Sequence, residues 1–151
     1  MPGGLEFQQT SNGNAELSGT PINGTGGVYN LFLSARNVAG KSVQNLSIIV
    51  DQKPQFDQAS HKNIVDTIGL GDFTPIRTTG FPPATITESG QLPSGFIFRS
   101  LPNGKAAISG RPALDAYGLY SISLTAQSVA GSVSIGISIV IVGLPFTTLI
   151  R

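Results

Sequence analysis

Two stretches near the end of the chain alternate apolar and polar residues with a period of two. In residues 122–126, isoleucine, leucine and alanine are separated by serine and threonine. Further on, every other residue from Ile135 to Ile141 is isoleucine. A period of two puts alternate side chains on opposite faces of a strand. Both stretches are therefore predicted to be strands with one buried face, joined by a hairpin turn at 129–132.

Shorter strands are expected in the region before them. A strand that contains Phe96 and Phe98 leads into Asn103-Gly104, a dipeptide that favours tight hairpins because both residues tolerate positive φ. Further strands are predicted at 63–70, 72–79 and 84–87, and the polar residues 58–63 are predicted to form an exposed loop. About seven strands without a helix predict an all-β fold, a sandwich of two sheets.

The first fifty residues resemble a later part of the same chain. At an offset of 91 residues, 18 of the first 50 positions are identical, without a gap. The matches include Ser18-Gly19-x-Pro21 with Ser109-Gly110-x-Pro112, and Gly27-x-Tyr29 with Gly118-x-Tyr120. A constant offset keeps every turn length, so both segments are predicted to follow the same path. The period is close to the roughly 100 residues of an immunoglobulin-like (Ig-like) sandwich.

The repeat predicts a chain of unequal parts. Residues 1–50 correspond to the second half of an Ig-like repeat, residues 51–142 to a complete repeat, and residues 143–151 to the start of a third, since Pro54-x-Phe56 reappears as Pro145-Phe146. Half a sandwich cannot close its core. Residues 1–50 are therefore expected to pair with another chain or to leave open strand edges, which invite self-association. Neighbouring Ig-like repeats are the expected partners.

Three motifs of the complete repeat carry a family resemblance. They are Leu92-Pro93-x-Gly95-x-x-Phe98, Ala107-Ile108-Ser109-Gly110-x-Pro112 and Gly118-x-Tyr120-x-Ile122-x-Leu124-x-Ala126. In these motifs the chain resembles the He-PIG family of Ig-like domains, cadherin-like sandwich modules repeated in large bacterial surface and secreted proteins. The resemblance implies tandem Ig-like sandwiches of about seven strands per unit, an extracellular or cell-surface location, and adhesion or spacing without catalytic residues.

Composition narrows the range of partners. Charged residues make up 11% of the chain and the net charge is +1, so nothing favours binding to nucleic acid. The longest apolar stretch, Ile135 to Leu144, is interrupted by glycine and serine and is shorter than the about 20 residues of a membrane helix, so no membrane insertion is expected. The absence of cysteine removes disulfides and thiolate chemistry.

Polar residues give little support for a catalytic or cofactor site. His61 is the only histidine, so no Ser-His-Asp arrangement can recur with the repeats, and no catalytic residue or cofactor is assigned. Calcium is the one candidate metal, because cadherin-like domains, which the chain resembles, can bind it between domains. Asp51 and Asp57 flank the junction of the repeats and would meet Asp115 there. The acids are scattered without an Asp-x-Asp cluster, which favours solvated surface carboxylates and no metal site.

Two functions are consistent with these features. The first is a non-catalytic structural spacer or adhesion module of a repetitive surface protein outside the cell. The second is a module appended to a secreted enzyme, which binds a host or cell-surface protein or glycan through a loop at one end of the sandwich. Residues 80–84 and 112–118 are the candidate loops, and they are predicted to lie at opposite ends or edges.

Overall fold

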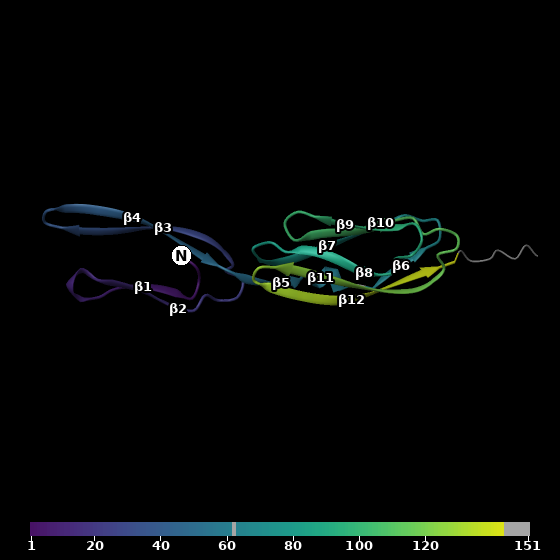
Figure 1. The fold of residues 1–151 in the computed structure, drawn as a ribbon, viewed down its shortest axis with the longest axis horizontal. Helices are drawn as coiled ribbons and strands as arrows, with labels where there is room; N and C mark the ends of the chain where they lie inside the picture. Colours follow the sequence, from purple (N-terminus) through teal and green to yellow (C-terminus); the bar gives the residue numbers. More distant parts are fainter. Residues whose placement is uncertain (62, 144–151) are drawn as a thin grey trace, which may run out of the picture. The chain divides into compact units, whose positions relative to one another are not determined.

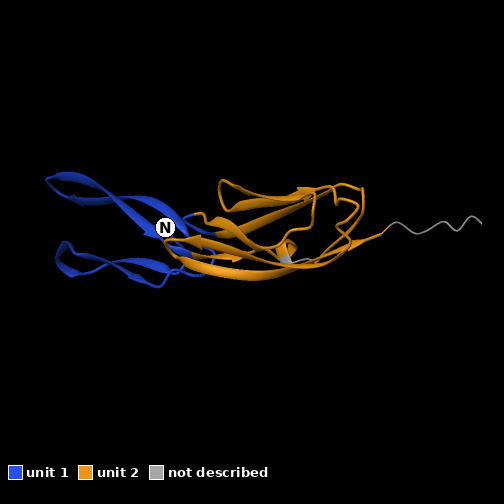
Figure 2. Ribbon diagram, turned by 45° about the vertical axis from the view of Figure 1, so that its right-hand side comes forward, with its two compact units in different colours: residues 1–52, 80–82 blue, residues 53–79, 83–151 orange. Residues whose placement is uncertain are grey.

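β-Strands form all the long elements of the computed structural model, which describes residues 1–61 and 63–143 (Figure 1). The chain divides into two compact units, coloured separately in Figure 2. Their bounds are residues 1–52 and 80–82 for unit 1, and residues 53–79 and 83–151 for unit 2. The all-β fold predicted from the sequence is confirmed. No helix among the described residues is long and apolar enough to cross a membrane.

Unit 1 consists of two antiparallel hairpins, each a two-stranded sheet. Their strands are β1 (Leu5–Gln9), β2 (Ala15–Gly19), β3 (Gly27–Asn37) and β4 (Gly40–Val50). A single 3₁₀ turn, η1 (Ser11–Gly13), joins β1 to β2. In the first part of β3, half-buried and exposed residues alternate, because successive side chains of a strand point to opposite faces.

Unit 2 is a sandwich of two four-stranded sheets. One sheet has the strand order β5-β7-β10-β9, and the other has the order β6-β12-β11-β8, in which β6 runs parallel to β12. The bounds are β5 (Gln52–Phe56), β6 (Ile64–Thr67), β7 (Asp72–Phe81), β8 (Thr85–Gly90), β9 (Phe96–Leu101), β10 (Lys105–Gly110), β11 (Gly118–Ser128) and β12 (Gly131–Val142). A short 3₁₀ helix, η2 (Gln58–His61), follows β5.

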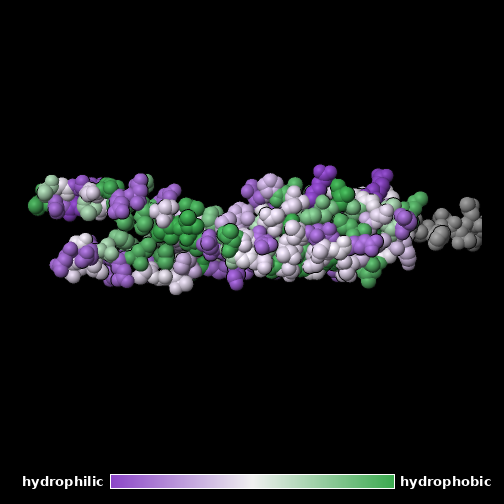
Figure 3. All heavy atoms as spheres, in the orientation of Figure 1, coloured by the Kyte–Doolittle hydropathy of each residue, from purple (hydrophilic) through white to green (hydrophobic). Residues whose placement is uncertain are grey.

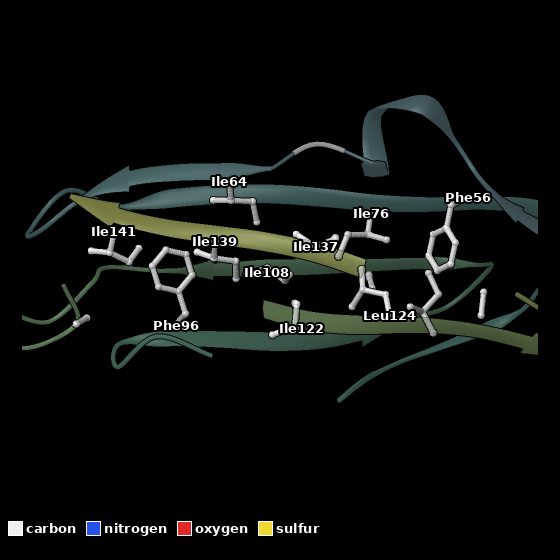
Figure 4. Packing of buried hydrophobic residues seen from close by; sticks show 14 of the residues in the cluster. Phe56, Ile64, Ile76, Phe96, Ile108, Ile122, Leu124, Ile137, Ile139 and Ile141 are labelled. Atoms are coloured by element: carbon white, nitrogen blue, oxygen red, sulfur yellow. The ribbon is translucent and has the colours of Figure 1, made fainter. Parts of the chain in front are cut away.

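The core of unit 2 is made of alternate residues from both sheets, which meet between the layers (Figure 4). Ile76 and Ile108 come from one sheet, and Ile86, Leu124 and Ile139 come from the other. All five are fully buried. Burial of one such side chain stabilises the folded state by about 1.5–3 kcal/mol. The period-two pattern seen in the sequence is therefore the feature that holds the two sheets together.

The first part of unit 2 differs from the sequence prediction in three details. The unit has eight strands, and one of them, β5, runs through Pro54 before the first strand predicted from the sequence. Proline has no backbone N–H to donate to a neighbouring strand, which an edge strand tolerates, and β5 lies at the edge of its sheet. The exposed loop predicted at 58–63 includes η2, in which Ser60 is only 2% exposed. The strand predicted at 63–70 is limited to β6, since the chain turns at Ile68.

The hairpins of unit 1 have counterparts in unit 2 at the sequence offset of 91 residues. The bounds of β3 coincide with those of β11, and the bounds of β1, β2 and β4 match those of β9, β10 and β12 to within one residue. The register agrees as well, since Leu5 lies opposite Gly19 and Phe96 lies opposite Gly110. The division into half a repeat, a complete repeat and the start of a third stays a prediction, and residues 144–151 lie outside the described residues.

Two glycines in each unit allow a close approach between backbone segments. A Cβ atom at Gly95 would lie 2.1 Å from the carbonyl oxygen of Arg111, and one at Gly110 would lie 2.1 Å from that of Gly95. In unit 1, a Cβ at Gly19 would lie 2.2 Å from the carbonyl oxygen of Gly4. Gly4 is the second such glycine of unit 1, since a Cβ there would lie 2.2 Å from the carbonyl oxygen of Thr20. No side chain fits at such distances, and all four glycines have positive φ. The repeated glycines therefore mark one local backbone shape that occurs twice.

Candidate interaction surface

The three acids considered as calcium ligands are not brought together. Asp57 follows β5, where its amide donates to the carbonyl oxygen of Arg77 at 3.1 Å, and Arg77 pairs with Lys105 at the start of β10. Asp115 follows the other end of β10 and is exposed. The length of this strand separates the two carboxylates, so the predicted meeting of Asp57 with Asp115 is wrong. Asp51 is exposed in unit 1.

Asp57 has a structural role at η2. Its Oδ1 accepts a hydrogen bond from the amide of Ser60 at 2.8 Å and another from the Ser60 hydroxyl. The Ser60 hydroxyl oxygen in turn accepts from the amide of Arg77 at 2.9 Å. Asp57 therefore caps this turn and ties it to β7. Among the described residues, no three His, Cys, Asp or Glu side chains are grouped so that they could hold a metal ion.

The two candidate binding loops lie beside opposite ends of β11. Thr85 follows the first loop and pairs with Gln127 near the end of β11, whereas Gly118 closes the second loop and begins β11. The second loop exposes two large side chains, Leu114 at 85% and Tyr117 at 72%. The exposure of these two side chains was not predicted, because apolar residues in a loop follow no strand period.

Unit 1 has an apolar surface that is partly open to solvent. We define this open face by nine apolar residues, and the equivalent of each at an offset of 91 belongs to, or packs against, the core of unit 2: Leu5, Phe7, Ala15, Leu17, Leu31, Leu33, Leu46, Ile48 and Val50. Phe7 is 52% exposed and Leu17 is 36% exposed. In unit 2 the equivalent of Leu17, Ile108, is completely buried. Figure 3 shows apolar side chains of unit 1 at the surface.

The strand edges that belong to the open face have no partner strand among the described residues. In unit 2, β10 pairs with β7, β11 with β8, and β12 with β6. The equivalent strands of unit 1, β2, β3 and β4, pair only within their own hairpins. An unpaired edge presents backbone N–H and C=O groups to a further strand. The open edges expected for half a sandwich are therefore present, and pairing with another chain stays a prediction.

Comparison with known proteins supports the fold and leaves the family open. No family model matches the sequence, and no curated protein sequence matches it. Among solved structures, the titin Ig tandem domains A164-A165 are similar at 14% identity and a TM-score of 0.56, covering 95% of this chain and 76% of that one. A chimeric titin Z1Z2 functionalized with a KLER exogenous peptide from decorin is similar at 17% identity and a TM-score of 0.52, covering 64% of this chain and 100% of that one.

An enzyme structure is also similar. It is a variant of the endo-fucoidan hydrolase MfFcnA4 from glycoside hydrolase family 107, at 18% identity and a TM-score of 0.50. The match covers 99% of this chain but only 24% of the hydrolase. Likeness at such low identity concerns the fold alone. The sheet topology and the titin neighbours together show that the chain is an all-β protein with an immunoglobulin-like sandwich fold.

Proposed function

We propose that this chain is a non-catalytic structural module of a repetitive protein displayed outside the cell, where Ig-like sandwiches act as spacers or adhesion units. The recurrence of the same pair of hairpins at an offset of 91 residues carries this proposal. An array of modules needs units of constant shape, and its stability is approximately a sum over units and their neighbours. Membership of the He-PIG family is part of the proposal and rests on the three sequence motifs, two of which contain the tightly packed glycines.

The path of the chain through unit 2 suits a spacer. β6 and β12 are parallel neighbours, with Ile64 opposite Ile139 and Thr67 opposite Val142. The chain reaches β6 through β5 and leaves β12 at its last residue. Once β5 has been pulled away from β7, a pull on the two ends therefore draws β6 and β12 past each other. Such shear loads all the hydrogen bonds between the strands together. A hairpin pulled from its open end breaks them one by one at lower force.

A second function, a glycan- or protein-binding module appended to a secreted enzyme, is favoured by two observations. Nearly the whole chain matches a quarter of an endo-fucoidan hydrolase in fold. The loop that precedes β11 exposes Leu114 and Tyr117, and an exposed aromatic ring supplies contact area at a low cost in conformational entropy. In this function the loop would hold the ligand, and the sandwich would position it.

Binding arrays separate the two functions. The labelled chain is incubated with arrays of sulfated and neutral glycans and of extracellular proteins, beside a Tyr117→Ser variant. A spacer gives no saturable signal that depends on Tyr117. A saturable signal that Tyr117→Ser removes establishes the binding module in its place.

Location outside the cell is tested separately. An antibody raised against unit 2 should label intact cells of the source organism or precipitate antigen from their medium. Antigen found only after lysis would contradict display at the surface and secretion alike.

A further inference from the structure

We propose that unit 1 is an acceptor for a first-half segment, an extended polypeptide with the apolar pattern of residues 53–91, which adds strands to the open edges and covers the open face. This inference goes beyond the proposed function, because it assigns a binding site and the chemistry of its occupant. It holds for a spacer and for a binding module alike.

Unit 2 shows what covers this kind of face. There, residues 53–91 supply Ile76 from β7 and Ile86 from β8, and both are fully buried. Beneath this cover Ile108 is 0% exposed, whereas its equivalent Leu17 is 36% exposed. The same comparison holds for Ala15, which is exposed while its equivalent Ala106 is buried. Apolar residues at alternate strand positions are therefore the chemistry that completes the open face.

The backbone of unit 1 is already arranged to receive such strands. In unit 2, β7 pairs with all six residues of β10, and β8 pairs with residues 122–127 of β11. The equivalent edges of unit 1, at residues 15–19 and 31–36, are already extended within their hairpins. A donor strand therefore meets a preformed edge, as in peptide recognition by β-strand addition, where main-chain hydrogen bonds supply affinity and side-chain pockets supply specificity.

Strand exchange between copies of this chain does not complete unit 1. Each copy has two second halves, residues 1–50 and 92–142, and one first half, residues 53–91. An exchange that gives unit 1 a first half takes that segment from a unit 2 and exposes the core around Ile108. The number of closed sandwiches stays the same, while association costs translational and rotational freedom. The occupant is therefore a further first-half segment, beyond the one that each copy holds.

The acceptor is not apolar along its whole length. Toward the turn between β3 and β4, Ser42 and Gln44 stand at the positions equivalent to Val133 and Ile135. On β4 the apolar part of the open face therefore begins at Leu46 and continues away from this turn, whereas on β3 it includes Leu33, which lies opposite Gln44. A donor is expected to pack most closely there, and to leave the hairpin tip in water.

The test uses the full chain and a synthetic peptide of residues 53–91 as the probe. The peptide should form a 1:1 complex in native mass spectrometry and slow amide hydrogen exchange at residues 15–19 and 31–36 by about tenfold or more. Two adjacent substitutions provide the control. Leu33→Ser on the open face should abolish the complex, whereas Phe32→Ser should keep it, because Phe32 is 74% exposed on the opposite face of β3.

A fused version removes any dependence on peptide solubility. A second copy of residues 53–91 placed before Met1 makes the pairing intramolecular, and the short connection raises the effective concentration to the millimolar range. The same edges should then be protected. Fast exchange at these edges in both experiments would overturn the proposal. Protection that grows with the concentration of the unmodified chain alone would also overturn it, because copies would then cover one another. Neither result bears on the binding arrays, so this inference and the proposed function fail separately.

Discussion

Equivalent truncations in the two units should differ several-fold in their cost. Ile108→Ala and Leu17→Ala each remove three carbon atoms, at matching positions of β10 and β2. Ile108 is fully buried between two sheets, so its truncation loses the transfer free energy and also leaves a cavity, which together cost about 4 kcal/mol. Leu17 is 36% exposed on the open face, where water can fill the space, and its truncation should cost about 1 kcal/mol.

Urea denaturation followed by circular dichroism measures the first cost, and hydrogen exchange with mass spectrometry assigns each loss to its unit. A loss of about 4 kcal/mol should lower the Tm of a unit of roughly 90 residues by about 20 °C. An equal loss for Leu17→Ala and Ile108→Ala would contradict this difference in burial. The open face would then be covered in the isolated chain, and the contrast between the two units would not exist in solution.

Three further predictions concern a buried hydroxyl, a tightly packed glycine and the scattered acids. Ser60→Ala removes the hydroxyl that bonds to Asp57 and to the amide of Arg77. It should lower the free energy of unfolding in urea titrations by about 1–3 kcal/mol, whereas Ser121→Ala at an exposed position should have little effect. Gly95→Ala forces a Cβ against the carbonyl oxygen of Arg111 and should lower the free energy of unfolding by more than about 3 kcal/mol. Gly136→Ala adds a carbon with no atom within 4 Å and should change this free energy by less than about 1 kcal/mol. Equal losses for the two variants would contradict the close approach at Gly95. Addition of about 1 mM calcium, a typical concentration for extracellular calcium sites, should shift the Tm by less than about 1 °C in scanning calorimetry. A rise of several degrees would show that the chain has a calcium site, although Asp51, Asp57 and Asp115 are not grouped to form one.

The strands of the second half were predictable because their pattern has a single physical cause. Between Gly118 and Ile141, alternate apolar residues face one core, and the connecting turn is short. The apolar pattern of these residues therefore follows the strand period of two throughout. The constant offset to residues 1–50 was equally informative, since equal turn lengths impose the same register on both hairpins.

The first half was less predictable because side-chain and edge effects decide its structure. Pro54 obscures a strand pattern, and only the position of β5 at the edge of its sheet makes proline tolerable there. The residues after it are polar, which favours a loop. The burial of Ser60 depends on bonds to Asp57 and to Arg77, which is 17 residues further along the chain. A local sequence pattern cannot predict a hydrogen bond to a residue so far along the chain.

The open face was predictable in part. Half a repeat implies uncovered strands, and the alternation of Leu31 and Leu33 identifies the side that lacks its cover. The scatter of acids predicts no calcium cluster, and this stays a prediction, but the expected meeting of Asp57 with Asp115 was wrong. Proximity to a repeat boundary in sequence does not state at which end of a strand a residue lies.

Single-molecule pulling on the two ends of the whole chain tests most directly whether it contains one closed sandwich and one open half. One main unfolding step is expected, which releases about 90 residues and corresponds to roughly 30 nm at about 3.6 Å per residue. The hairpins of unit 1 should extend earlier and at low force. A single step of roughly 50 nm, or two high-force steps of similar length, would contradict it.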